Sequence, residues 1–213
     1  MSDYVQRVYS AVNERRPKEI QSLVREAIDA GTDVGRIMNE GLIAAMDEVG
    51  RQFAEGEIFV PEMLVSAHTM KLGLEVVKPL LKGDAAASKG TVILGTVKGD
   101  LHDIGKNVVA MMLEGAGFHV IDLGVDLTVE KVVDKVKELE PDIVGLSALL
   151  TTTMPEMKNV ISALETAGLR GKVKVMVGGA PVDARFAAQI GADGHGKDAA
   201  EAVSLARRLV AVD

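Results

Sequence analysis

The stretch TVILGTVKGDLHDIGKN, residues 91–107, decides the fold of this chain. Its first seven residues, TVILGTV, are rich in β-branched side chains and indicate a buried strand. Its last residues indicate the start of a helix, and the loop between them carries His102 between Asp100 and Asp103. A buried strand that runs directly into a helix predicts a βαβ unit of a parallel sheet.

The same alternation of strand and helix continues along the second half of the chain. Three more short apolar runs follow, namely FHVIDLG (118–124), DIVGLSA (142–148) and KVKVMVGG (172–179). A weaker fifth strand is expected near Ala192, before a last helix over 199–212. Five strands over residues 91–213 predict an α/β, flavodoxin-like (Rossmann-like) domain with a parallel sheet of strand order 2-1-3-4-5. Ligands bind such sheets beyond the carboxyl ends of strands 1 and 3, which is where the loop with His102 lies.

The first half of the chain has a helical period instead. Apolar residues recur there at steps of three and four, which predicts a four-helix bundle cap domain over residues 1–82. The clearest stripe consists of Met63, Ala67, Met70, Leu74, Val77 and Leu81. The small, polar stretch KGDAAASKG (82–90) predicts a linker over residues 83–90.

Composition excludes several classes of protein. Charged residues make up 26% of the 213 and no apolar run approaches the roughly 20 residues of a membrane span, so we expect no membrane partner. The start MSDYVQRVYS lacks the pattern of a signal peptide, which makes the cytoplasm the expected compartment. A net charge of −7 with 3% aromatic residues argues against a nucleic-acid partner. The chain has no cysteine, so thiolate ligands and cysteine nucleophiles are excluded.

The loop with His102 fails the patterns of three common sites. A phosphate-binding loop needs GxxxxGK and then Ser or Thr, but five residues separate Gly99 from Gly105 here, and Asn107 follows Lys106. A phospho-acceptor receiver domain needs an Asp after strand 3, where Ser147 stands. A hydrolytic triad would need a GxSxG elbow, and none is present.

A single histidine suits one kind of metal site. The four histidines, His68, His102, His119 and His195, are scattered along the chain, whereas a bare zinc or iron ion needs three or four protein ligands. A macrocyclic cofactor needs only one axial ligand, and a carboxylate such as Asp100 often accepts the other N–H of a ligating histidine. On this loop alone, a solvated histidine and a helix-capping Asp103 remain the alternative.

Two further segments give the loop a family resemblance. Asp100-x-His102-x-x-Gly105, then Ser147-x-Leu149, then Gly178-Gly179 resembles the cobalamin-binding signature of base-off/His-on corrinoid proteins. The stretch GEIFVPEMLVSAHTMK (56–71) is similar to the cap domain of the cobalamin module of methionine synthase. The whole chain most resembles the corrinoid proteins of methylotrophic methyltransferase systems in methanogens and acetogens.

The resemblance implies a role for each matching residue. His102 would be the lower axial ligand to the cobalt of cobalamin, Asp100 would hydrogen-bond it, and Thr153 would continue this relay. Gly105 would let the displaced nucleotide tail of the cofactor pass close to the backbone. The remaining cofactor-binding residues implied are Gly99, Leu101, Asp103 and Ile104 in the loop, Ser147, Leu149, Thr151, Gly178, Gly179 and Ala180 along the tail, and Phe59 and Met63 in the cap.

The resemblance also implies a function in one-carbon metabolism. The chain would be a non-catalytic carrier whose cobalamin alternates between cobalt(I) and methyl-cobalt(III). Its partners would be a substrate:corrinoid methyltransferase, a corrinoid:tetrahydrofolate or corrinoid:coenzyme M methyltransferase, and a reductive activase. The methyl donor stays open between methanol, methylamines, betaine and aryl methyl ethers. The alternatives are the cobalamin-binding subunit of an adenosylcobalamin-dependent mutase and a regulatory cobalamin binder.

Overall fold

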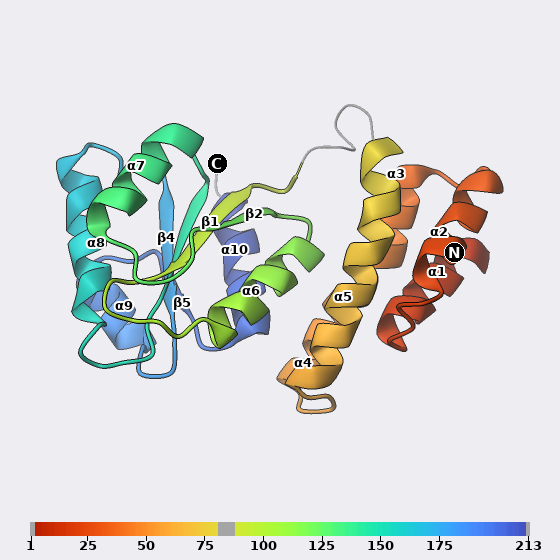
Figure 1. Cartoon of the computed structure of the whole chain (residues 1–213), viewed down its shortest axis with the longest axis horizontal. Coiled ribbons are helices and arrows are strands. Elements are labelled where there is room, and N and C mark those ends of the chain that lie inside the picture. Colours follow the sequence, from red (N-terminus) through yellow and green to blue (C-terminus); the bar gives the residue numbers. More distant parts are fainter. Residues whose placement is uncertain (1–2, 81–87, 212–213) are drawn as a thin grey trace. The chain divides into compact units, whose positions relative to one another are not determined.

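Helices form the part of the chain before residue 81, as the apolar period predicts (Figure 1). The computed structural model describes residues 3–80 and 88–211. The helices before residue 81 are α1 (Asp3–Asn13), α2 (Ile20–Asp29), α3 (Val34–Arg36), η1 (Ile37–Ile43), α4 (Ala44–Ala54), α5 (Val60–Val77) and the short η2 (Lys78–Leu80). Of these, α3, η1 and α4 follow one another without a break, so the bundle has four main helices.

The predicted stripe on α5 is buried. Met63, Ala67, Met70, Leu74 and Val77 all lie in the core, while Leu81 lies outside the described residues. The π-helical segment η1 carries Gly41, at which a Cβ would come within 3.0 Å of Val8 Cγ1. The absence of a side chain at Gly41 therefore lets α1 pack closely against η1.

The rest of the chain alternates strands and helices. The strands are β1 (Thr91–Thr96), β2 (His119–Asp122), β3 (Ile143–Ser147), β4 (Lys174–Gly178) and β5 (Gly194–Gly196). The helices are α6 (Ile104–Gly115), α7 (Val129–Leu139), α8 (Pro155–Thr166), α9 (Ala184–Ile190) and α10 (Ala199–Val210). All strand pairs are parallel and the order is β2-β1-β3-β4-β5, so the predicted topology is confirmed.

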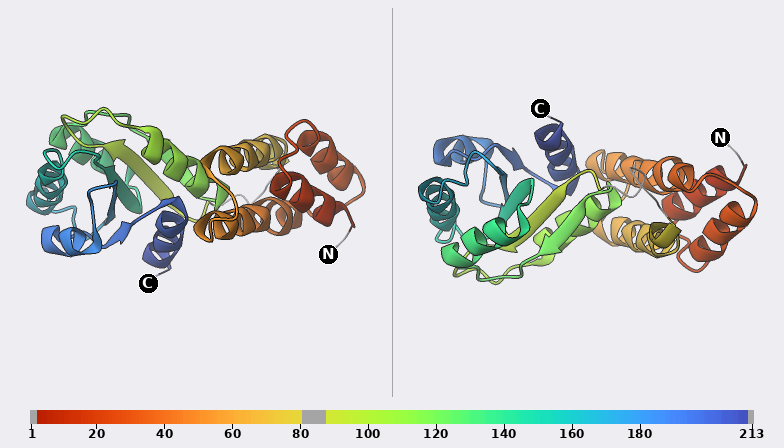
Figure 2. Two further views of the ribbon diagram at one scale, coloured as in Figure 1. Left: turned by 90° about the horizontal axis from the view of Figure 1, so that it is seen from below. Right: turned by 90° about the horizontal axis from the view of Figure 1, so that it is seen from above.

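Helices cover both faces of this sheet (Figure 2). Alternate strand residues such as Ile93, Val144 and Val175 pack with the apolar sides of α7, α8 and α9 in one core, while α6 and α10 lie on the other face. Burial on both faces explains why the strands are almost wholly apolar. The fifth strand begins at Gly194, two residues after the predicted position.

The chain divides into two compact units, one mainly before residue 89 and the other mainly after it. Residues 83–87 of the predicted linker lie outside the described residues. Within the described ranges, no helix is long and apolar enough to cross a membrane.

Candidate functional site

The carboxyl ends of four strands lie level with one another. Thr96 pairs with Ser147, Ser147 with Gly178, and Gly178 with Gly196, each as the last residue of its strand. The loops that follow β1, β3 and β4 therefore leave the sheet at the same edge. This register brings together the three segments that the sequence singled out.

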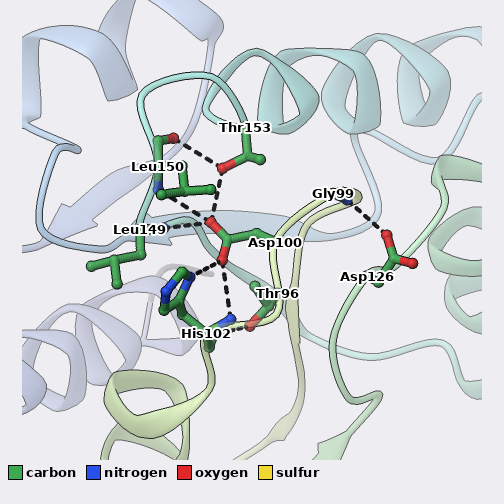
Figure 3. Close-up of polar contacts among 8 residues, drawn as sticks. All are labelled: Thr96, Gly99, Asp100, His102, Asp126, Leu149, Leu150 and Thr153. Carbon is green, nitrogen blue, oxygen red and sulfur yellow. Dashed lines mark hydrogen bonds and ion pairs between the residues drawn. The ribbon is translucent and has the colours of Figure 1, made fainter.

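Asp100 lies at the centre of this edge and is completely buried (Figure 3). Its Oδ1 accepts hydrogen bonds from the backbone N–H of His102 (3.1 Å) and from His102 Nδ1 (2.7 Å). Its Oδ2 accepts from the N–H groups of Leu149 (2.8 Å) and Leu150 (3.2 Å) and from Thr153 Oγ1 (2.8 Å). One carboxylate thus joins the loop after β1 to the loop after β3.

These contacts fix the charge of Asp100. Burial alone would raise the pKa of this carboxyl, but the hydrogen bonds from Leu149, His102 and Thr153 outweigh burial and hold the pKa well below its usual range. An ionised carboxylate can only accept hydrogen bonds, so His102 Nδ1 must carry a hydrogen. The neutral imidazole then has its lone pair on Nε2.

His102 presents its ring at the surface. The side chain is 53% exposed, although the carboxylate that it contacts is buried. Its backbone is also held, because the buried Thr96 hydroxyl donates a hydrogen bond to the His102 carbonyl oxygen (2.9 Å). The structure therefore combines a fixed backbone, a fixed Nδ1 and an accessible Nε2, as a metal-ligating histidine requires.

Apolar side chains are exposed on the same loops and at the start of α6. Leu101 is 71% and Ile104 is 79% exposed, and Leu149 and Leu150 are 43% and 41% exposed. We call these four residues the apolar rim. Exposed apolar side chains that share loops with a polar site are typical of a surface that receives an apolar ligand.

Glycines allow close approach to the backbone at this edge. A Cβ at Gly105 would have no atom within 4 Å, so the space above this position is open. Gly179 has φ +122°, and a Cβ there would lie 1.9 Å from the Ala148 carbonyl oxygen, so only glycine fits. In β5, the Nε2 atom of His195 is buried and has no hydrogen-bond partner in the part of the chain that the structure describes.

The other predicted residues have varied surroundings. Asp103 directly precedes α6: its carbonyl oxygen accepts the Asn107 N–H, and its carboxylate accepts from Asn107 Nδ2. Ser147 is half-buried, and Thr151 and Ala180 are exposed. In the bundle, Phe59 is 69% exposed, whereas Met63 is buried in the core of its own unit.

A buried cation lies beside the site. The side chain of Lys106 in α6 is almost fully buried, and its Nζ donates to a carboxylate oxygen of Asp122 and to Asn107 Oδ1 (2.8 Å). The Asp122 side chain is half-exposed, and its other oxygen accepts the Gly124 N–H (2.9 Å). The pair ties the first turn of α6 to the end of β2.

Three contacts at this site were not predicted from the sequence. They involve Thr96, Leu150 and Asp126, whose Oδ1 accepts the Gly99 N–H (2.7 Å). A hydroxyl at the end of the apolar strand TVILGTV was a usable signal for Thr96. The contact of Asp126 depends on the path of a different loop, which no local pattern reports.

No group of three or more histidine and carboxylate side chains is arranged to hold a metal ion within residues 3–80 and 88–211.

Two family models match the chain. Residues 4–78 match a model described as a B12 binding domain, and residues 90–204 match a second model with the same description. Trimethylamine corrinoid protein 2 of Methanosarcina mazei is 45% identical over 192 residues, which are 89% of this chain and 88% of the relative. Dimethylamine corrinoid protein 1 of Methanosarcina acetivorans is 46% identical over 180 residues, or 84% of each chain.

Solved structures agree with the sequence matches. The methanol:cobalamin methyltransferase complex MtaBC from Methanosarcina barkeri contains a chain that is 32% identical, with a TM-score of 0.89, over 100% of this chain and 81% of that one. A cobalamin-binding protein from Desulfitobacterium hafniense is 33% identical, with a TM-score of 0.82, over 96% and 98% of the two chains. The predicted family is confirmed: the chain belongs to the B12-binding corrinoid proteins of methyltransferase systems.

Proposed function

We propose that this chain is a methyl-carrying corrinoid protein that holds cobalamin in the base-off/His-on form, with His102 Nε2 as the lower axial ligand. The observation that carries the proposal is the 2.7 Å hydrogen bond between His102 Nδ1 and the buried, ionised Asp100. This bond orients the ring and leaves Nε2 accessible. When bound, the cofactor supplies a cobalt centre that takes up and gives up a methyl group.

The surroundings of His102 support a large, flat and mainly apolar ligand. The apolar rim offers four exposed side chains to the face of a macrocycle. Open space at Gly105 gives room for the displaced nucleotide tail, and the unpartnered Nε2 of His195 offers a polar atom at the same sheet edge. Of the two cap residues, the exposed Phe59 is the better candidate to cover the cofactor.

In this proposal, Asp100 provides a negative charge beside His102, and Thr153 stabilises that charge by a hydrogen bond. Asp100 has five donors in contact with its two oxygens, so it remains an anion whether or not His102 is coordinated. His102 Nε2 is then the ring atom that would bind the cobalt, and the half-exposed ring leaves this side of the imidazole accessible. Thr153 Oγ1 acts on His102 only through the carboxylate.

Methylamines are the first donors to test. Relatives that are 45% and 46% identical are named as trimethylamine and dimethylamine corrinoid proteins, and a structural relative belongs to a methanol:cobalamin methyltransferase complex. We infer that this chain receives its methyl group from a substrate:corrinoid methyltransferase. A corrinoid:coenzyme M or corrinoid:tetrahydrofolate methyltransferase would then remove it as a methyl cation, which returns the cobalt to the cobalt(I) state. A reductive activase would be needed only where cobalt(I) has been oxidised to cobalt(II).

Electron paramagnetic resonance of the cobalt(II) protein tests the ligand. One axial ¹⁴N nucleus splits each cobalt line into three, and labelling of the histidines with ¹⁵N should change each triplet into a doublet. His102→Ala should abolish the effect of the label, while His119→Ala, an exposed histidine at the start of β2, should retain it. A triplet that persists in the labelled wild-type protein would show that the ligand is the cofactor's own base.

A transfer assay separates the carrier from its alternatives. Reduced holoprotein is incubated with trimethylamine, dimethylamine, monomethylamine or methanol and the matching methyltransferase, and methylation is followed by absorbance. We expect methylation with one of these pairs. Failure with every pair, together with tight binding of adenosylcobalamin, would favour a mutase subunit or a regulatory binder.

A further inference from the structure

The loop after β2 runs along the loop that carries Asp100 and His102. Gly124 and Leu127 hydrogen-bond Thr96: its N–H donates to the Gly124 carbonyl oxygen and its carbonyl oxygen accepts the Leu127 N–H, both at 3.0 Å. Val97 also forms an isolated parallel bridge with Leu127. Leu127 is buried, and a Cβ at Gly95 would lie 1.9 Å from its Cδ1. Residues 124–127 are therefore firmly seated against the end of β1.

Asp126 is the point of this segment that reaches the site. Its backbone N–H donates to the Asp100 carbonyl oxygen (3.1 Å), and its Oδ1 accepts the Gly99 N–H (2.7 Å; Figure 3). Asp126 thus binds the main chain on both sides of the Asp100 side chain. No other residue drawn in Figure 3 holds this turn from the loop after β2.

The backbone of Asp126 is in an unfavourable conformation. Its φ is +53°, in the left-handed region, which aspartate and asparagine adopt more readily than other residues with a side chain but less readily than glycine, and Gly99 opposite has φ +80°. Such conformations persist where the surrounding contacts compensate for their cost, and they are frequent at functional sites. Here the compensating contacts are the two hydrogen bonds to the turn that carries Asp100.

We propose that Asp126 is a positioning residue for the Asp100–His102 pair: it fixes the turn between Gly99 and Asp100 and so directs the Asp100 carboxylate at His102 Nδ1. Asp126 contacts neither His102 nor Thr153 in Figure 3, so it acts through the backbone. The inference rests on the proposed function only where cobalamin binding is measured. The tautomer of His102 is a second readout, which needs no cofactor.

Three variants separate the carboxylate from the backbone conformation. Asp126→Asn keeps an oxygen that can accept the Gly99 N–H, and asparagine tolerates the left-handed region. Asp126→Ala removes the acceptor and raises the backbone cost, because alanine adopts the left-handed region less readily than aspartate. Asp126→Gly removes the acceptor but adopts φ +53° freely.

Asp142→Ala is a matched control. Like Asp126, Asp142 contacts a neighbouring segment through both its backbone N–H and its carboxylate. Its N–H donates to the Thr91 carbonyl oxygen (2.9 Å), and its Oδ2 accepts the Thr91 N–H (2.7 Å). These contacts lie at the start of β1 and β3, at the opposite edge of the sheet. The control therefore reports what the loss of such a clamp does to the whole domain.

The first measurement is the imidazole ¹⁵N spectrum of the full-length, cofactor-free protein at one pH above neutrality. The chain has four histidines, and His102→Ala identifies the signals of His102. In the wild type and in Asp126→Asn we expect the Nδ1–H tautomer. In Asp126→Ala and Asp126→Gly we expect the ratio of Nδ1–H to Nε2–H to fall on the order of fivefold, because the hydrogen bond to Asp100 is weakened. Asp142→Ala should keep the wild-type ratio.

The second measurement is the dissociation constant of hydroxocobalamin. It should rise on the order of tenfold in Asp126→Ala and Asp126→Gly, as for the loss of other contacts behind a metal ligand. An unchanged tautomer ratio in both variants would overturn the inference, as would a normal ratio in Asp126→Gly alone. A changed ratio with no cobalamin binding even in the wild type would instead reject the proposed function and leave the role of Asp126 intact.

Discussion

Asp100 Oδ2 and Thr153 Oγ1 lie 2.8 Å apart, although 53 positions separate the two residues in the sequence. Both side chains are buried, so water does not compete with either group for this hydrogen bond. It connects two loops that are also joined by hydrogen bonds from the Leu149 and Leu150 N–H groups to the same carboxylate. Substitutions at its two ends should therefore affect stability and the site together.

Thr153→Val tests the donor of this bond. Valine keeps the shape of threonine but leaves Asp100 Oδ2 and the Leu150 carbonyl oxygen without the hydroxyl, which lies 2.9 Å from the latter. We expect the free energy of unfolding to fall by about 1–2 kcal/mol, measured by urea denaturation. Thr153→Ser should retain most of the stability. Unchanged stability in Thr153→Val would contradict the assignment, and a loss confined to Thr153→Ser would assign the effect to packing of the methyl group.

Asp100→Asn tests the acceptor through pH. Because the pKa of Asp100 is held below its unfolded value of about 3.9, the stabilisation is fully present above that value. It is lost as the pH falls through the lower pKa of the folded state. The variant should thus be less stable by about 2 kcal/mol at neutral pH, and the difference should shrink only below about pH 4. Urea denaturation at several pH values measures this, and a difference that shrinks near neutrality would contradict the assignment.

Gly179→Ala should be strongly destabilising. The new Cβ would lie 1.9 Å from the Ala148 carbonyl oxygen, and φ is +122°. Gly191→Ala provides the control, because φ is +79° there but no atom lies within 4 Å of the Cβ. We expect a loss of about 1 kcal/mol at Gly191 and about 3 kcal/mol at Gly179 in thermal or urea unfolding. Similar losses would mean that the loop after β4 moves to make room.

Replacing Asp122 should lower the stability of the protein more than replacing its ion-pair partner Lys106. Asp122→Asn leaves a buried ammonium without its counter-ion, which should cost about 3 kcal/mol. Lys106→Met fills the same space with an apolar side chain and leaves a half-exposed carboxylate that water can solvate, so we expect a loss below about 1 kcal/mol. Urea denaturation of both variants checks the order, and the reverse order would show that Lys106 is solvated.

Ile104→Ser tests the apolar rim. Ile104 is 79% exposed, so the stability of the cofactor-free protein should stay within about 0.5 kcal/mol of the wild type. The dissociation constant of cobalamin should rise on the order of tenfold, because burial of an isoleucine contributes about 1.5 kcal/mol or more. Titration followed by absorbance measures it. A normal affinity would exclude Ile104 from the contact with the cofactor.

The sequence predicts the fold well because its signals are local. Short β-branched apolar runs identify the strands, a helical period identifies the helices, and the strand order follows from the size of the domain. The contact between Asp100 and His102 spans two positions, so the loop itself suggests it. The contact of Gly99 with Asp126 spans 27 positions and depends on a left-handed residue, which has no signature in the sequence. Likewise, the sequence allows Met63 to lie either in the core of the bundle or against the cofactor. Only the packing of the bundle shows that it is buried.

The apolar rim also has a consequence for the lifetime of the chain. Exposed leucine and isoleucine side chains promote self-association, so protein made without its ligand should be prone to aggregate. A ligand that binds only the folded state at a concentration one hundred times its dissociation constant adds about 2.7 kcal/mol to stability. The amount of cobalamin in the cell would then determine how much of this polypeptide persists. We expect a shortage of cobalamin to lower the amount of the chain through proteolysis.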